Sequence, residues 1–169
     1  TISVTDTRSS SYGQLGGISG GKSVTNDGTI TLNSATGIQS AQAVTNNGRI
    51  VQAAGGRAAT GVSGFTSLVN TGTIEVAGNA VVMDYPGGTI DNSGRIASTG
   101  GIAISQNYSY GTIIRNLAGG TIAGATGQSA IRLGGGQLTN AGTITGDVDL
   151  GYASYGGRSY ASAVYTNNG

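Results

Sequence analysis

One five-residue pattern, Asn-x-Gly-Thr/Arg-Ile, returns along this chain every 20 to 24 residues. Five copies are regular, and a sixth carries two extra residues before its Gly-Thr-Ile. The copies occupy residues 26–30, 46–50, 70–74, 92–96, 116–122 and 140–144. An apolar side chain stands two residues before each Asn, and another short apolar patch lies about midway to the next copy. Self-similarity at a fixed period of this length indicates a solenoid or another repeat architecture.

Each period has room for three short strands that are separated by turns. Gly accounts for 33 of the 169 residues, and Asn and Ser stand beside it in the expected turns. No segment shows helical spacing over a useful length. We therefore expect residues 1–169 to form one all-β domain, a right-handed parallel β-helix of about seven coils of 20–28 residues. An antiparallel sandwich is the alternative, but it does not need the same residue types to return in every period.

The residues of the pattern have distinct structural roles in such a coil. Asn tolerates left-handed backbone conformations, and its amide both donates and accepts hydrogen bonds. Stacked at one corner, these side chains are expected to form a ladder of Asn26, Asn46, Asn70, Asn92, Asn116, Asn140 and Asn167. The Ile of each copy is expected to point inward, which predicts a core column of Ile2, Ile30, Ile50, Ile74, Ile96, Ile122 and Ile144. The residue before each Ile is expected to point outward, where Thr and Arg exchange freely.

The two ends of the chain together would complete a seventh copy of the pattern. Read from the last residues into the first, the sequence is T-N-N-G-T-I-S-V, which parallels residues 25–32. The residues of this expected junction are Thr1, Ile2, Ser3, Val4, Thr166, Asn167, Asn168 and Gly169. Natural solenoids normally finish in atypical capping repeats, and neither end resembles one. We therefore expect the chain to be one unit of a tandem array or to stack head to tail with other copies into an open fibre.

The composition excludes several classes of function. Without Cys or His the chain cannot build a Cys/His zinc site, a Ser-His-Asp triad or a Cys-His nucleophile. A net charge of +1 lacks the basic surplus that nucleic-acid binding needs, and no apolar run is long enough for membrane insertion. Among the seven acidic residues, the pairs Asp84/Asp91 and Asp147/Asp149 are weak candidates for sugar chemistry or calcium, with Asp147 and Asp149 the metal candidates. We expect no enzymatic activity and no cofactor.

Tyrosine is the dominant aromatic residue, with 8 Tyr against 1 Phe and no Trp. Three copies of Ser-Tyr-Gly lie outside the pattern, and the densest Tyr segment is 152–166. Tyr and Arg on loops suit a contact surface, because Tyr offers amphipathic area at low entropic cost. These side chains are candidates for contact between fibres or for glycan binding, or they shield the sides of the solenoid: Tyr12, Tyr110, Tyr152, Tyr155, Arg158 and Tyr160.

The recurring Asn-x-Gly-Thr-Ile, with Gly-Gly-Thr-Ile at 87–90 and 119–122, resembles the passenger regions of bacterial autotransporters, which use type V secretion. The sequence is less closely similar to filamentous-haemagglutinin-like exoproteins. The resemblance spans about residues 20–151 and implies a secreted protein, extracellular or on the bacterial cell surface. It leads us to expect a structural protein of extracellular fibres or surface stalks whose main partner is another copy of itself. An adhesin fragment that binds glycans through Tyr-rich loops is the alternative, and a carbohydrate-active enzyme is a minor one.

Overall fold

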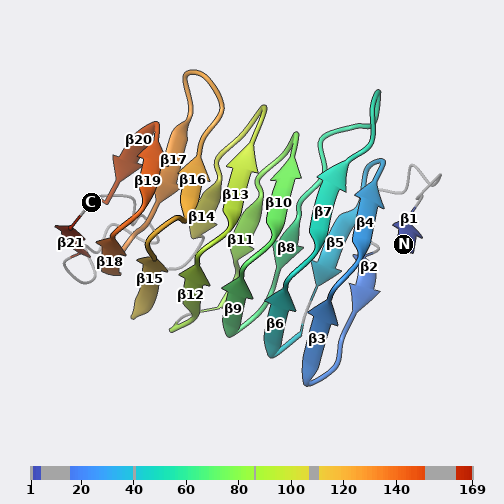
Figure 1. The fold of residues 1–169 in the computed structure, drawn as a ribbon, viewed down its shortest axis with the longest axis horizontal. Helices are drawn as coiled ribbons and strands as arrows, with labels where there is room; N and C mark the ends of the chain where they lie inside the picture. The colour runs from blue at the N-terminus through green and yellow to red at the C-terminus, as the bar shows by residue number, and fades with distance from the viewer. Residues whose placement is uncertain are drawn as a thin grey trace, which may run out of the picture.

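The computed structural model describes residues 2–4, 16–39, 41–85, 87–106, 111–150 and 163–168. Within these ranges the chain forms 21 strands and no helix, and the strands make three parallel sheets of seven strands each (Figure 1). Neighbouring strands in a sheet are three apart in chain order, so each set of three strands completes one coil. The predicted parallel β-solenoid is confirmed, with about six full turns between the first and last strands of a sheet, close to the seven coils expected.

The three sheets are named here by the residues that mark them. The Ile sheet holds the Ile of each sequence pattern and consists of β1 (Ile2–Val4), β4 (Thr29–Leu32), β7 (Arg49–Gln52), β10 (Thr73–Val76), β13 (Arg95–Ser98), β16 (Thr121–Ala123) and β19 (Thr143–Thr145). The middle sheet consists of β2 (Gly16–Ser19), β5 (Thr36–Gln39), β8 (Val62–Ser63), β11 (Val81–Met83), β14 (Ile104–Gln106), β17 (Ser129–Arg132) and β20 (Asp147–Asp149). The Asn sheet, whose strands reach the pattern Asn, consists of β3 (Ser23–Asn26), β6 (Ala43–Asn46), β9 (Ser67–Asn70), β12 (Thr89–Asn92), β15 (Thr112–Asn116), β18 (Gly136–Asn140) and β21 (Ala163–Asn167).

The register of the Ile sheet places every pattern Ile beside the next one. Ile2 is paired with Ile30, and the pairing continues coil by coil to Ile144. From Ile30 to Ile122 these side chains are fully buried, and Ile144 in the last coil is partly buried. Because side chains alternate between the two faces of a strand, a slip of one residue would turn this column outward. The hydrophobic pattern therefore fixes the register of the whole sheet.

Two further apolar columns lie in the core between the sheets. The middle sheet and the Asn sheet each contribute one apolar column, whose interior members are at most 1% exposed: Ile38, Val62, Val81, Ile104 and Ile131, and Val44, Leu68, Ile90, Ile114 and Leu138. Full burial of one such side chain stabilises the fold by about 1.5–3 kcal/mol. The core is therefore an axial stack of similar layers.

The connection between β7 and β8, residues 53–61, is organised by a single side chain, that of Gln52. Its Nε2 donates to the carbonyl oxygens of Leu32 at 3.0 Å and of Arg57 at 2.8 Å. Its Oε1 accepts from the backbone N–H of Ala59 at 3.2 Å and of Ala77 at 3.5 Å. Gln52 thus ties this connection to the coils before and after it.

We expect Gln52→Ala to release the β7–β8 connection while leaving the solenoid folded. Several hydrogen bonds to one carboxamide are lost, which predicts a stability decrease of about 1–2 kcal/mol. Limited trypsin digestion should cut after Arg57 several times faster than in the unmodified chain. Gln39→Ala, which truncates the same side-chain type on the middle sheet, is the control. An unchanged cleavage rate at Arg57 would show that Gln52 does not hold the connection.

Candidate functional site at the ends of the solenoid

The pattern Asn side chains form one continuous hydrogen-bonded ladder along the solenoid. Each Nδ2 donates to the Oδ1 of the Asn one coil later, at 2.6–2.8 Å, in six successive bonds. The members, all but the last of them buried, are Asn26, Asn46, Asn70, Asn92, Asn116, Asn140 and Asn167. The ladder therefore links every coil to the next through side chains as well as through the backbone.

Backbone carbonyl groups fix the orientation of each ladder amide. The Nδ2 of Asn92 also donates to the carbonyl oxygens of Gly94 at 3.3 Å and of Thr121 at 3.2 Å. The Nδ2 of Asn46 is held in the same way by Gly48 and Thr73. A reversed amide would bring its Oδ1 against these carbonyl oxygens, and neither atom could donate. Every link consequently donates toward the C-terminal end.

The two termini lie at opposite ends of the long axis of the solenoid (Figure 1). At the C-terminal end Tyr165 is 41% exposed, while Val148 is only partly buried. At the N-terminal end Ile18 and Val24 are also only partly buried. The same columns are fully covered in the middle of the solenoid. In the described part of the chain, these core columns are therefore less completely buried at each end than in the middle.

The first and last strands of each sheet have a neighbouring strand on one side only. In the part of the chain that the structure describes, β19, β20 and β21 are each paired on one side only, and so are β1, β2 and β3. An unpaired strand edge is a template on which another strand can add. Among the described residues, each end therefore has three strand edges without a neighbouring strand.

The described part of the predicted junction lies at these two ends. Ile2, Ser3 and Val4 form β1 at one end, with Ile2 in register with Ile30. At the other end Thr166 and Asn167 belong to β21, in register with Thr139 and Asn140. The backbone N–H of Asn168 donates to the carbonyl oxygen of Asn140 at 2.7 Å. Thr1 and Gly169 lie outside the described residues.

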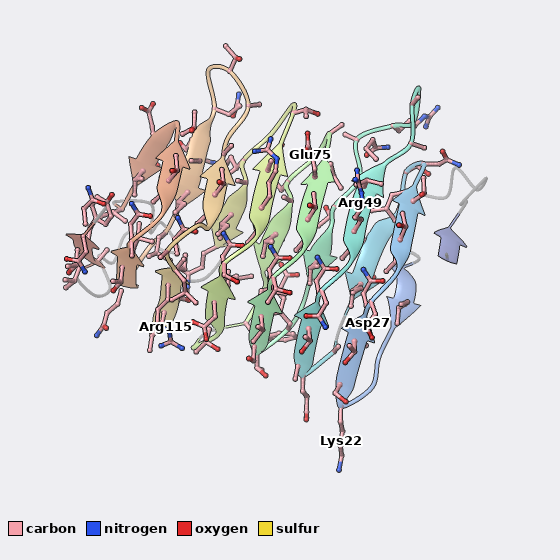
Figure 2. The ribbon with its side chains drawn as sticks, in the orientation of Figure 1. Lys22, Asp27, Arg49, Glu75 and Arg115 are labelled. Carbon is pink, nitrogen blue, oxygen red and sulfur yellow. The ribbon has the colours of Figure 1, made fainter. Side chains whose placement is uncertain are left out.

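Charged side chains on the outer faces pair between neighbouring coils. Arg115 donates to both carboxylate oxygens of Asp91, at 2.5 and 3.0 Å, and this hydrogen bonding together with the charge of Asp91 raises the pKa of Arg115. Arg95 pairs with Glu75 at 2.9 Å on the Ile sheet. Figure 2 shows Arg115, Arg49 and Glu75 on separate strands along the solenoid. Because these pairs are largely exposed, each contributes little to stability.

Two of the acidic residues considered from the sequence lie beside arginine side chains. Asp91 is bonded to Arg115, and Asp149 Oδ2 lies 3.7 Å from Arg132 Nε. Among the described residues there is no group of three or more His, Cys, Asp or Glu side chains that could hold a metal ion. Within the described ranges, the weak calcium candidate at Asp147 and Asp149 therefore has the Arg132 side chain beside it and belongs to no group of three acidic side chains.

The Tyr and Arg candidates for lateral contact or glycan binding all lie outside the described residues, namely Tyr12, Tyr110, Tyr152, Tyr155, Arg158 and Tyr160.

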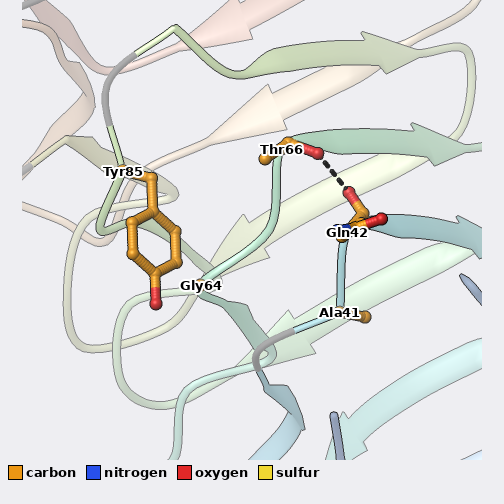
Figure 3. Close-up of a pocket in the computed structure, with 5 residues that line it drawn as sticks. All are labelled: Ala41, Gln42, Gly64, Thr66 and Tyr85. Atoms are coloured by element: carbon orange, nitrogen blue, oxygen red, sulfur yellow. Dashed lines mark hydrogen bonds between the residues drawn. The ribbon is translucent and has the colours of Figure 1, made fainter. Parts of the chain in front are cut away.

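A different tyrosine, Tyr85, borders a hollow of about 210 Å³ between the middle sheet and the Asn sheet, together with Ala41, Gln42, Gly64 and Thr66 (Figure 3). Tyr85 is 50% exposed, and Thr66 Oγ1 donates to the carbonyl oxygen of Gln42. The side-chain groups that remain to meet a ligand are the Tyr85 ring and the Gln42 carboxamide. Sequence reasoning missed this hollow, although the turn-forming Asp-Tyr-Pro-Gly-Gly around Tyr85 signals a corner.

Comparison with known proteins adds no family to this description. No protein-family model matches the chain, and no curated protein or solved structure matches it. No helix among the described residues is long and apolar enough to span a bilayer. The less completely buried ends of the described solenoid and the ladder that connects them are thus the features on which a functional proposal rests.

Proposed function

We propose that this chain is a structural protein, the building unit of an extracellular fibre or surface stalk that grows by end-to-end stacking of solenoids. The units are either separate copies or successive parts of a tandem array. The observation that carries the proposal is the incomplete burial of the first and last described coils, where core columns that are fully buried inside the solenoid become partly exposed.

End-to-end stacking would give the strands and core residues at both ends the same kinds of contact that already join neighbouring coils. Among the described residues, the three strands at each end are paired on one side only and would gain a second partner, and Tyr165 and Val148 would be removed from water. Burial of apolar area at roughly 25 cal/mol per Å² favours this contact. An association that does not close on itself produces an open fibre.

The extracellular setting is supported by the resemblance of the repeats to autotransporter passengers. The absence of Cys is also compatible with a secreted protein that is stabilised by stacked backbone hydrogen bonds in place of disulfides. We include secretion to the bacterial surface or beyond it in the proposal on these grounds.

Negative-stain electron microscopy of the 169-residue chain at neutral pH tests the proposal. We expect unbranched fibres with an axial repeat of about 34 Å, which is seven coils at ~4.8 Å each. A charged, Pro-rich segment appended after Gly169 should abolish the fibres, because it prevents strand addition at that end.

The control places the same charged segment in the exposed β7–β8 connection at Gly55, where it leaves both ends open. Fibres should then persist. Separate short rods from the unmodified chain would contradict assembly by separate copies. The glycan-binding alternative, at the Tyr-rich segments or at Tyr85, would then be the one to test.

A further inference from the structure

The Asn ladder gives the solenoid a chemical direction. All six described bonds donate from a coil to the one that follows it. At the N-terminal end, the Oδ1 of Asn26 accepts only a long bond of 3.3 Å from Gly28 N–H among the described residues. At the C-terminal end Asn167 is exposed, and its Nδ2 has no acceptor within the described part of the chain. One end of the ladder therefore offers an acceptor and the other a donor.

We propose that copies join in one direction only, with Asn167 Nδ2 of one copy donating to Asn26 Oδ1 of the next. The inference rests on the proposed function and specifies its partner, a second copy of this chain, and the polarity of the contact. The resulting fibre has two different ends and a ladder that runs through every junction.

The register within the chain specifies the rest of the contact. Continuing the three-strand order places β1, β2 and β3 of the next copy on β19, β20 and β21. Val148 then meets Ile18 of the next copy, and Tyr165 meets its Val24, because these residues occupy the same columns. The partly covered core residues of one end thus lie against those of the other.

Joining in the opposite sense would lose these matches. Two N-terminal ends would bring two Asn26 Oδ1 acceptors together, and two C-terminal ends would bring two Asn167 Nδ2 donors together. Acceptor against acceptor, or donor against donor, forms no hydrogen bond and leaves desolvated polar atoms unpaired. The ladder thus selects head-to-tail contact over both symmetric arrangements.

The substitution Asn167→Asp tests the donor without disturbing the chain's own ladder. The new carboxylate can still accept the bond from Asn140 Nδ2, but it has no proton to donate to the next copy. We expect the dissociation constant for end-to-end contact, measured by sedimentation velocity over a concentration series, to rise by about 10- to 100-fold. The thermal unfolding midpoint of the dissociated chain should be unchanged.

Thr166→Asp is the matched control, because it adds the same charge one residue earlier on the same strand. Thr166 occupies the outward column in which Asp91 already stands, so a carboxylate is compatible with that position. Its assembly should match that of the unmodified chain. Lowering the pH below about 4 protonates the introduced carboxylate and restores a donor, so assembly of the Asn167→Asp chain, relative to the unmodified chain at the same pH, should recover.

A chain of two copies, with Gly169 of the first followed by Thr1 of the second, tests the junction even if separate copies do not associate. We expect one cooperative unfolding transition with a higher denaturant midpoint than that of a single copy. Asn167→Asp in the first copy should remove the increase, whereas Thr166→Asp should keep it.

The outcomes separate the inference from the function on which it rests. If fibres form equally well with Asn167→Asp, the directional ladder is wrong and fibre formation stands. If the two-copy chain unfolds like a single copy and the unmodified chain forms no fibres, both the junction and the structural function are wrong.

Discussion

Asn92→Ala should lower the free energy of unfolding by about 3 kcal/mol, because it removes one complete link from the buried ladder. Asn92 accepts from Asn70 Nδ2 at 2.8 Å and donates to Asn116 Oδ1 at 2.8 Å. The alanine leaves Asn70 Nδ2 without its side-chain acceptor and Asn116 Oδ1 without its donor. A buried polar group that loses its partner costs about 1–3 kcal/mol. Urea denaturation followed by circular dichroism measures the change.

Ser93→Ala is the control for this measurement. It truncates the neighbouring exposed side chain in the same turn and should change stability by less than about 0.5 kcal/mol. Equal effects at positions 92 and 93 would mean that the ladder contributes nothing beyond the backbone pairing of the coils.

Gly72→Ala should be at least as damaging, with a loss of about 3 kcal/mol or more or a failure to fold. A Cβ at position 72 would overlap the carbonyl oxygen of Gly48, which belongs to the preceding coil. The contact is with backbone, so no side-chain rotation relieves it and the coils would have to move apart. Overpacking of a well-packed core typically costs about 1–3 kcal/mol, and a backbone clash lies at the upper end of that range or beyond it. Chemical denaturation, or the soluble yield if the variant does not fold, measures the effect.

Gly55→Ala separates the effect of space from that of backbone conformation. Gly55 has a φ of 73°, and a methyl group on its Cα would meet nothing within 4 Å, so its substitution costs only the left-handed conformation, about 1–2 kcal/mol. Gly72 has no positive φ, and its requirement is space alone. If Gly72→Ala is no worse than Gly55→Ala, close stacking at the corner is not what requires glycine there.

The polarity of the ladder connects these effects on stability to assembly. The same amide contact joins coils inside the chain and, in the proposed fibre, joins one copy to the next. Interior substitutions such as Asn92→Ala are therefore expected to affect folding, whereas Asn167→Asp is expected to affect association with folding unchanged.

The sequence best predicted the features in which each coil repeats the packing environment of the coil before it. The pattern Asn and Ile recur at nearly constant spacing, and a parallel solenoid places residues of equal phase in the same column, as Ile74 and Ile96 show. Strand content, the number of sheets and the inward columns follow from that period. The middle sheet was less well specified, because strands such as β8, Val62–Ser63, are very short and carry no fixed motif.

The sequence did not predict features that depend on how the side chains of adjacent coils are oriented toward one another. Gln52 looks like an ordinary polar residue at the end of a strand, yet its carboxamide holds the β7–β8 connection through bonds to Leu32 and Arg57. The bond between Asp91 and Arg115 joins residues 24 apart that become neighbours only once β12 and β15 pair. The hollow beside Tyr85 likewise arises from corners of different coils.

By itself the sequence determined the period, the three strands of each coil and the residues that stack. The reason is that apolar and turn residues repeated at this period are all buried together when each coil stacks in register on the one before it. Only the tertiary structure decided the direction of the Asn ladder and the absence of room at Gly72. Both depend on the orientation of groups in adjacent coils, the first on which backbone carbonyls face each amide and the second on the distance between neighbouring turns.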